Sequence, residues 1–118
     1  MNRKVYIETS VISYLTARPN NDIRVMANQN VTIEWWETQR LNFDLFISEF
    51  VVAEASLGHP DAVKRRLEVI ADIMELQATE EVRVLGQELI RRNALPANAE
   101  IDAYHVAIAT VNGIEYML

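Results

Sequence analysis

Short apolar runs alternate with longer helix-like segments along the entire chain. The runs cover residues 4–7, 45–47, 73–76 and 114–118. Each run has the length and the apolar character of a buried strand. Strands that alternate with helices predict an α/β fold whose sheet is mainly parallel, has about four strands and carries helices on both faces.

The segments between these runs show the periodicity and the end signals of helices. Ser48 and Thr79 are good N-caps, and Pro60 suits a first helical turn. Gly58 and Gly113 are natural helix stops. We expect the last helix to be buried on most sides because it is apolar nearly all round. The predicted helices cover residues 9–15, 23–40, 48–57, 60–70, 79–92 and 99–112, with a loop at 19–22 and a linker at 94–97.

The chain has 118 residues, half of them apolar, which fits one compact domain over residues 1–118. It contains no cysteine, which excludes disulfides, thiolate nucleophiles and zinc sites built on cysteine. Any metal would therefore be held by Asp, Glu or the two histidines, His59 and His105. No run approaches the roughly 18 apolar residues that a membrane span needs. We therefore expect a soluble protein of the cytoplasm.

The formal net charge of the chain is −6. Non-specific affinity for phosphates comes mainly from Lys and Arg, so this charge argues against a general nucleic-acid coat. It does not exclude a nuclease, because an enzyme that gathers carboxylates around divalent cations can be acidic overall. Lys64, Arg65 and Arg66 are candidate phosphate contacts, as are Arg91 and Arg92, although charge runs of this kind more often form a solvated helix face.

Three acidic residues stand in or beside segments that otherwise look buried. Glu8 follows the first apolar run, Glu54 interrupts residues 50–55, and Asp102 interrupts residues 101–111. Burying an ionised carboxylate without a partner is costly, and no Lys or Arg lies within residues 50–55 or 101–111. The compensation could come from distant arginines, raised pKa values or divalent cations.

The expected position of these acids indicates a chemistry. In open α/β sheets, binding sites form outside the carboxyl ends of the strands. Glu8 would lie at such an end, and Asp102, near the start of its helix, can face the same edge. Carboxylates that converge there suit magnesium or manganese, hard ions that prefer oxygen ligands. Such ions activate water and stabilise the charge developing on a phosphodiester, so the pattern indicates phosphodiester hydrolysis.

Each acid also has a purely structural explanation. Glu8 could be a solvated strand end, Glu54 an exposed corner and Asp102 a partner of the helix dipole. His105 lies one turn after Asp102, a spacing that can share a metal. A histidine that packs with its hydrogen bonds satisfied is nevertheless the more common case.

These motifs, in this order, resemble those of the PIN-domain family and in particular its VapC-type toxins. Residues 5–11 resemble the family's opening of an apolar strand, an acid and small hydroxyl residues. Ser48 followed by Glu54 is similar to the second motif, and residues 102–109 are similar to the third. The resemblance spans essentially the whole chain.

The resemblance implies a PIN-like fold with an acidic site that binds Mg²⁺ or Mn²⁺. It also implies the RNA endonuclease activity of a toxin in a type II toxin–antitoxin system. The implied partners are an RNA substrate, a cognate antitoxin protein and a second copy of the chain in a homodimer. The implied catalytic and metal-binding residues are Glu8, Glu54 and Asp102, and the implied supporting polar residues are Thr9, Ser10 and Ser48.

Two departures from the family pattern bear on activity. Glu8 stands where an aspartate is usual, which lengthens the side chain and moves the carboxylate outward. The chain ends in the apolar residues 116–118, where the family normally continues with a fourth acidic or amide position and a further strand. We therefore expect a C-terminally incomplete domain with an exposed sheet edge. The main alternative is a catalytically inactive PIN-like module that binds proteins or dimerises, and a receiver-like signalling domain is a weaker one.

Overall fold

The computed structural model describes residues 2–92 and 100–118. The predicted strands and helices all appear in this part of the chain, in the predicted order. The predicted linker at residues 94–97 and the predicted helix start at residue 99 lie outside the described residues. The strands are β1 (Arg3–Tyr6), β2 (Phe43–Ser48), β3 (Met74–Leu76) and β4 (Tyr116–Met117). The helices are α1 (Thr9–Thr16), α2 (Ile23–Gln39), α3 (Glu49–Ala55), α4 (Pro60–Ile70), α5 (Glu80–Arg91) and α6 (Glu100–Val111), and a short 3-10 helix, η1 (Arg40–Asn42), joins α2 to β2.

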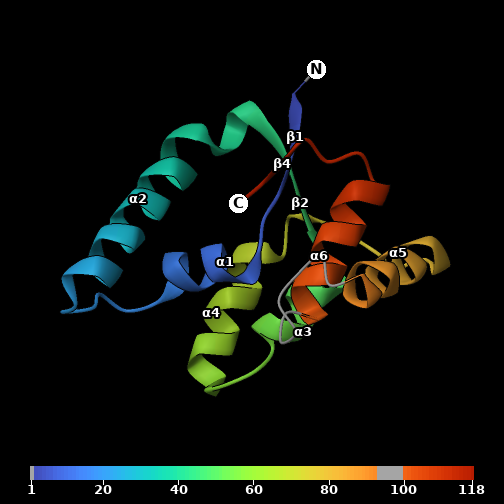
Figure 1. Cartoon of the computed structure of the whole chain (residues 1–118). Coiled ribbons are helices and arrows are strands. Elements are labelled where there is room, and N and C mark those ends of the chain that lie inside the picture. The colour runs from blue at the N-terminus through green and yellow to red at the C-terminus, as the bar shows by residue number, and fades with distance from the viewer. Residues whose placement is uncertain (1, 93–99) are drawn as a thin grey trace.

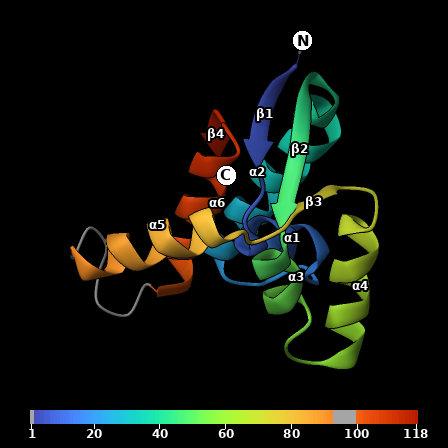
Figure 2. The ribbon, with the colours of Figure 1, turned by 90° about the vertical axis from the view of Figure 1, so that its right-hand side faces the viewer.

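The strands form one sheet in the order β3-β2-β1-β4, and every neighbouring pair is parallel. Figure 2 shows β1 and β2 side by side with their arrows pointing the same way. Tyr6, the last residue of β1, pairs with Phe46, and β2 continues to Ser48, so both strands end at the same edge of the sheet. Residues that follow these two strands are therefore placed at one edge of the sheet. The predicted parallel sheet of about four strands is confirmed.

Helices cover both faces of the sheet, as predicted. In Figure 1, α1, α2 and α4 lie on one side of the strands, and α5 and α6 lie on the other. The short helix α3 contacts both α1 and α6, so it joins the two helical layers where β2 ends. Within residues 2–92 and 100–118, no helix is both long and apolar enough to cross a membrane.

The core lies between the central strands and the helices that follow them. It includes the end of β1 and the residue after it, the end of β2, and the inner faces of α1 and α6. Helix α6 is buried along most of its length, as its apolar sequence predicts. The largest fully buried apolar side chains are Tyr6, Ile7, Ile12, Ile47 and Ile108.

Helix α2 forms where predicted. Its apolar residues Ile23, Ala27, Val31 and Trp35 recur four positions apart, which is typical of a buried stripe, but they do not form one, since Ile23 is 77% and Val31 is 66% exposed. Trp35 packs against the core near the end of the helix. In the first half of α2 the buried side chain is Gln29, whose Nε2 donates to the carbonyl oxygen of Arg18 at 3.0 Å. An amide bonded to the preceding loop, and not an apolar stripe, therefore orients this half of the helix.

Two arginines of α4 correct the expectation of a solvated basic face. Nε of Arg65 donates to the carbonyl oxygen of Thr16 at 3.0 Å, and Nε of Arg66 donates to that of Ala55 at 3.0 Å. These carbonyls belong to the last turns of α1 and α3, where helix carbonyls lack partners within the helix and a cation is favourable. Both arginines therefore cap the ends of neighbouring helices.

Candidate active site

The candidate active site lies at the carboxyl edge of the sheet, where β1 and β2 end. Glu8 is the N-cap residue of α1 and Thr9 is the first residue of that helix, so both follow β1 closely. Ser48 ends β2 and is the N-cap of α3, as predicted. Because parallel strands bring their carboxyl ends to one edge, these residues gather there although they are distant in the sequence.

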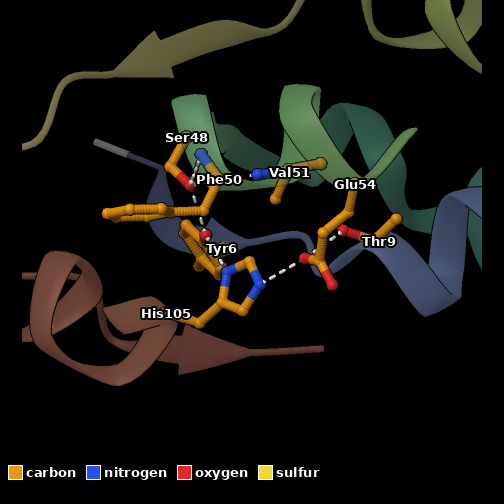
Figure 3. Close-up of polar contacts among 7 residues, drawn as sticks. All are labelled: Tyr6, Thr9, Ser48, Phe50, Val51, Glu54 and His105. Atoms are coloured by element: carbon orange, nitrogen blue, oxygen red, sulfur yellow. Dashed lines mark hydrogen bonds and ion pairs between the residues drawn. The ribbon is translucent and has the colours of Figure 1, made fainter. Parts of the chain in front are cut away.

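Glu54 lies in the last turn of α3 and is held by two hydrogen-bond donors. Its Oε1 atom accepts a hydrogen bond from the Thr9 hydroxyl at 2.9 Å and another from Nε2 of His105 at 2.6 Å (Figure 3). The Glu54 side chain is 33% exposed, whereas that of His105 is almost completely buried. Glu54 therefore stands at the boundary between core and solvent, with one oxygen fixed by residues of α1 and α6.

A buried hydrogen-bonded chain continues inward from His105. The Tyr6 hydroxyl lies 2.5 Å from Nδ1 of His105 and 2.7 Å from Oγ of Ser48 (Figure 3). Oγ of Ser48 also accepts hydrogen bonds from the backbone N–H groups of Phe50 and Val51 at the start of α3. No buried side-chain nitrogen or oxygen in the described part of the chain lacks a partner, so this polar cluster is satisfied within the core.

The sequence alone does not single out Tyr6, and it predicts that His105 packs with its hydrogen bonds satisfied. The structure confirms that prediction and shows that Tyr6 is the partner of His105. The pair could have been found from the hydrogen-bond requirements of two buried polar groups. A hydroxyl in a buried strand and an imidazole in an apolar helix each require a hydrogen-bond partner inside the core.

The predicted carboxylates are close enough to influence one another. Burial is the main reason that the pKa of Glu8 is raised, and the negative charges of Asp102 and Glu54 add to the rise. Asp102 itself is exposed in the first turn of α6, so the expected burial of its segment does not extend to this residue. Glu8 thus lies close enough to Glu54 and Asp102, at one edge of the sheet, for their negative charges to act on it.

The donor set fits a divalent cation in its chemistry. Carboxylate oxygens are the ligands that Mg²⁺ and Mn²⁺ prefer, and a cation would relieve the repulsion at Glu8. The side chains are not already arranged around an ion: in the described ranges, no three His, Cys, Asp or Glu side chains form a group that could hold a metal. Of the predicted supporting residues, Thr9 and Ser48 join the hydrogen-bonded cluster, whereas Ser10 is exposed on α1.

Glu8→Gln is expected to stabilise the metal-free chain at neutral pH. A raised pKa means that folding disfavours the ionised carboxylate, so stability falls as the pH rises from the ordinary glutamate value of 4.5 through the raised value. The amide removes this cost. Thermal unfolding with a chelator present should show the stabilisation at neutral pH and none well below pH 4.5. Glu34→Gln, at an exposed residue of α2, is the control; equal stability of Glu8→Gln and the parent at neutral pH would contradict the prediction.

Comparison with solved structures identifies the fold. VapC20 of Mycobacterium tuberculosis, a toxin that cleaves the sarcin–ricin loop, is 18% identical with a TM-score of 0.71, over 96% of this chain and 86% of that one. FitAcB of Neisseria gonorrhoeae is 24% identical with a TM-score of 0.58, over 95% of this chain and 84% of that one. No protein-family model and no curated protein matches the sequence. The chain has the PIN-like α/β fold of these neighbours.

Proposed function

We propose that this chain is a metal-dependent RNA endonuclease of the toxin–antitoxin type. The observation that carries the proposal is the gathering of Glu8, Glu54 and Asp102 at the carboxyl edge of a parallel sheet, where burial and, to a smaller extent, the charges of Asp102 and Glu54 raise the pKa of Glu8. The fold shared with VapC20, a toxin that cleaves the sarcin–ricin loop, supports the same class of activity.

In this proposal Glu8, Glu54 and Asp102 are the catalytic residues and hold Mg²⁺ or Mn²⁺. When bound, the ion lowers the pKa of a coordinated water and stabilises the charge that develops on the phosphodiester. Glu54 is held ready by the donors on its Oε1 atom, and Asp102 faces solvent, where an RNA backbone can approach. The supporting polar residues are Thr9, Ser10 and Ser48.

The same proposal assigns partners and a location. RNA is the substrate, a cognate antitoxin protein silences the activity, and two copies of the chain form a homodimer in the cytoplasm. A net charge of −6 means that the chain as a whole repels RNA. Contact with phosphate then depends on the bound cation and a few local basic residues.

A catalytically inactive PIN-like module that binds other proteins is the second candidate. The observation that favours it is that, within residues 2–92 and 100–118, no three acidic or histidine side chains are already arranged as a metal site. This candidate predicts a fully folded chain that does not respond to magnesium or manganese. Titration with metal therefore separates the two functions.

Calorimetric titration with Mg²⁺ and Mn²⁺, followed by incubation with ribosomal RNA, tests the proposal. The parent chain is expected to bind metal and cleave RNA, and Glu8→Gln and Asp102→Asn are expected to lose metal binding. Cleavage by Asp102→Asn should fall by about 100-fold or more, the effect of removing one group that stabilises transition-state charge. Glu34→Gln, an exposed carboxylate on α2, is the matched control and should behave as the parent. A folded parent chain that binds neither ion would favour the inactive module.

A further inference from the structure

His105 connects the buried Tyr6 to the partly exposed Glu54. Its ring packs edge-on against Phe50, with centroids 6.2 Å apart, and only 2% of the residue is exposed. Nδ1 lies 2.5 Å from the Tyr6 hydroxyl, and Nε2 lies 2.6 Å from Oε1 of Glu54 (Figure 3). The imidazole therefore cannot turn without losing both hydrogen bonds.

Counting donors and acceptors fixes the direction of the hydrogen bonds. Oγ of Ser48 already accepts from the N–H groups of Phe50 and Val51, at 3.1 and 3.4 Å, which uses both of its lone pairs. The Ser48 hydroxyl must therefore donate to the oxygen of Tyr6, 2.7 Å away. The Tyr6 hydroxyl is then free to donate to Nδ1 of His105.

The other end of the hydrogen-bonded chain, at Glu54, requires the same direction of donation. A carboxylate can only accept hydrogen bonds, so Nε2 of His105 must carry the proton that it shares with Oε1 of Glu54. In the reverse direction Nδ1 would donate to Tyr6 and Tyr6 to Ser48. Oγ of Ser48 would then face three donors, and its own hydrogen would have no partner. The one arrangement that satisfies every group runs from Ser48 through Tyr6 and His105 to Glu54.

The protonation of the Tyr6 hydroxyl agrees with its role as a donor to His105. Burial is the main reason that its pKa is raised; the hydrogen bond with Ser48 opposes the rise, and the carboxylates of Glu8 and Glu54 add to it. The phenol therefore keeps its proton and can act as a donor.

The two carboxylate oxygens of Glu54 differ in their hydrogen-bond partners. Oε1 receives hydrogen bonds from both His105 and Thr9. Among the described residues, Oε2 has no hydrogen-bond partner, and no contact is drawn to it in Figure 3. The two donors come from α6 and α1, so the carboxylate is fixed from two sides.

We propose that His105 is a positioning residue for Glu54, held between Tyr6 and Glu54 in the tautomer with its proton on Nε2, so that Oε2 of Glu54 is presented to the divalent cation. The inference rests on the proposed function, since it concerns the same metal site. Groups that orient a metal-ligating carboxylate typically change metal affinity by about 10- to 100-fold when they are removed.

Replacing His105 with two different amides tests this role. The amide nitrogen of glutamine can reach the position of Nε2, whereas that of asparagine reaches only the position of Nδ1. His105→Asn is therefore expected to weaken Mn²⁺ binding about 10- to 100-fold, and His105→Gln to stay within a few-fold of the parent. Thermal unfolding of both variants checks that they fold. Equal loss of affinity in two folded variants would mean that His105 only fills space, and no loss in either would remove its role; both outcomes overturn the proposal.

The tautomer of His105 provides a readout that needs no metal. Long-range ¹H–¹⁵N spectra of the labelled, metal-free chain should show the proton on Nε2. Tyr6→Phe removes the donor to Nδ1 and should shift the Nδ1 resonance, while the proton on Nε2 stays because Glu54 accepts it. A proton on Nδ1 would overturn the assignment. Failure of the parent chain to bind Mn²⁺ would instead contradict the proposed function and the cation's part in this inference, while the spectra still decide whether Tyr6 and His105 hold Glu54 as described.

Discussion

Ile12→Ala is expected to lower the free energy of unfolding by about 2–5 kcal/mol. Ile12 is completely buried in α1 and belongs to the main core cluster. Truncation removes its apolar contacts and leaves a cavity, because the helix is held on several sides by α2, α3 and α4 and cannot collapse fully into the space. The same helix begins beside Glu8 and carries Thr9, so the loss also loosens one side of the candidate site.

Urea unfolding, with the slope of the transition compared between proteins, measures this effect. Ile23→Ala makes the same chemical change in α2 at a side chain that is 77% exposed, and it should change stability by less than about 0.5 kcal/mol. Similar losses for the two variants would show that burial of Ile12 is not what holds α1 in place.

Gly86→Ala is expected to destabilise the protein by up to about 2 kcal/mol, although alanine favours helices. A Cβ atom at Gly86 of α5 would lie 2.6 Å from Cδ1 and Cε1 of Tyr104 in α6. The Tyr104 ring is stacked on Phe50, with centroids 5.5 Å apart, and cannot turn away freely. Overpacking of this kind costs about 1–3 kcal/mol, against which the alanine regains about 1 kcal/mol of helix propensity.

A double-mutant cycle with Tyr104→Ala isolates the cause. Once the ring is removed, Gly86→Ala meets no obstacle and should stabilise the protein by about 0.5–1 kcal/mol through helix propensity alone. The sign of the effect therefore reverses between the two backgrounds. Destabilisation of the same size in both would rule out the clash with Tyr104. Gly86 thus permits the close approach of α5 to α6, the helix that carries Asp102 and His105.

The sheet and its helices could be predicted because their signals are local. Ser48 is a capping residue directly after an apolar run, and this alone places a strand end and a helix start, as observed. The packing of α2 could not be predicted in the same way. The spacing of Ile23 and Val31 fits a buried stripe, but the contact of Gln29 with the preceding loop decides which side faces inward.

The sequence indicates the acidic residues of the candidate site, but it does not indicate the residues that hold them in place. Glu8, Glu54 and Asp102 stand out because acids are rare in segments that look buried. Tyr6 and His105 do not stand out, because they are 99 positions apart and each is ordinary in its own segment. Only the crossing of α6 over the end of β1 brings them together. The exposure of Asp102 likewise depends on where its helix begins relative to the sheet.

The hydrogen-bonded chain begins and ends at helix α3. Ser48 caps its start and Glu54 lies in its last turn, so the path through Tyr6 and His105 leaves the helix and returns to it. The polar groups therefore form a closed ring, of which α3 is one side. In an open chain a link can lengthen while the others keep their geometry. In a ring, a displacement of α3, of the end of β1 or of the first half of α6 strains the other hydrogen bonds as well, including those to the carboxylate of Glu54.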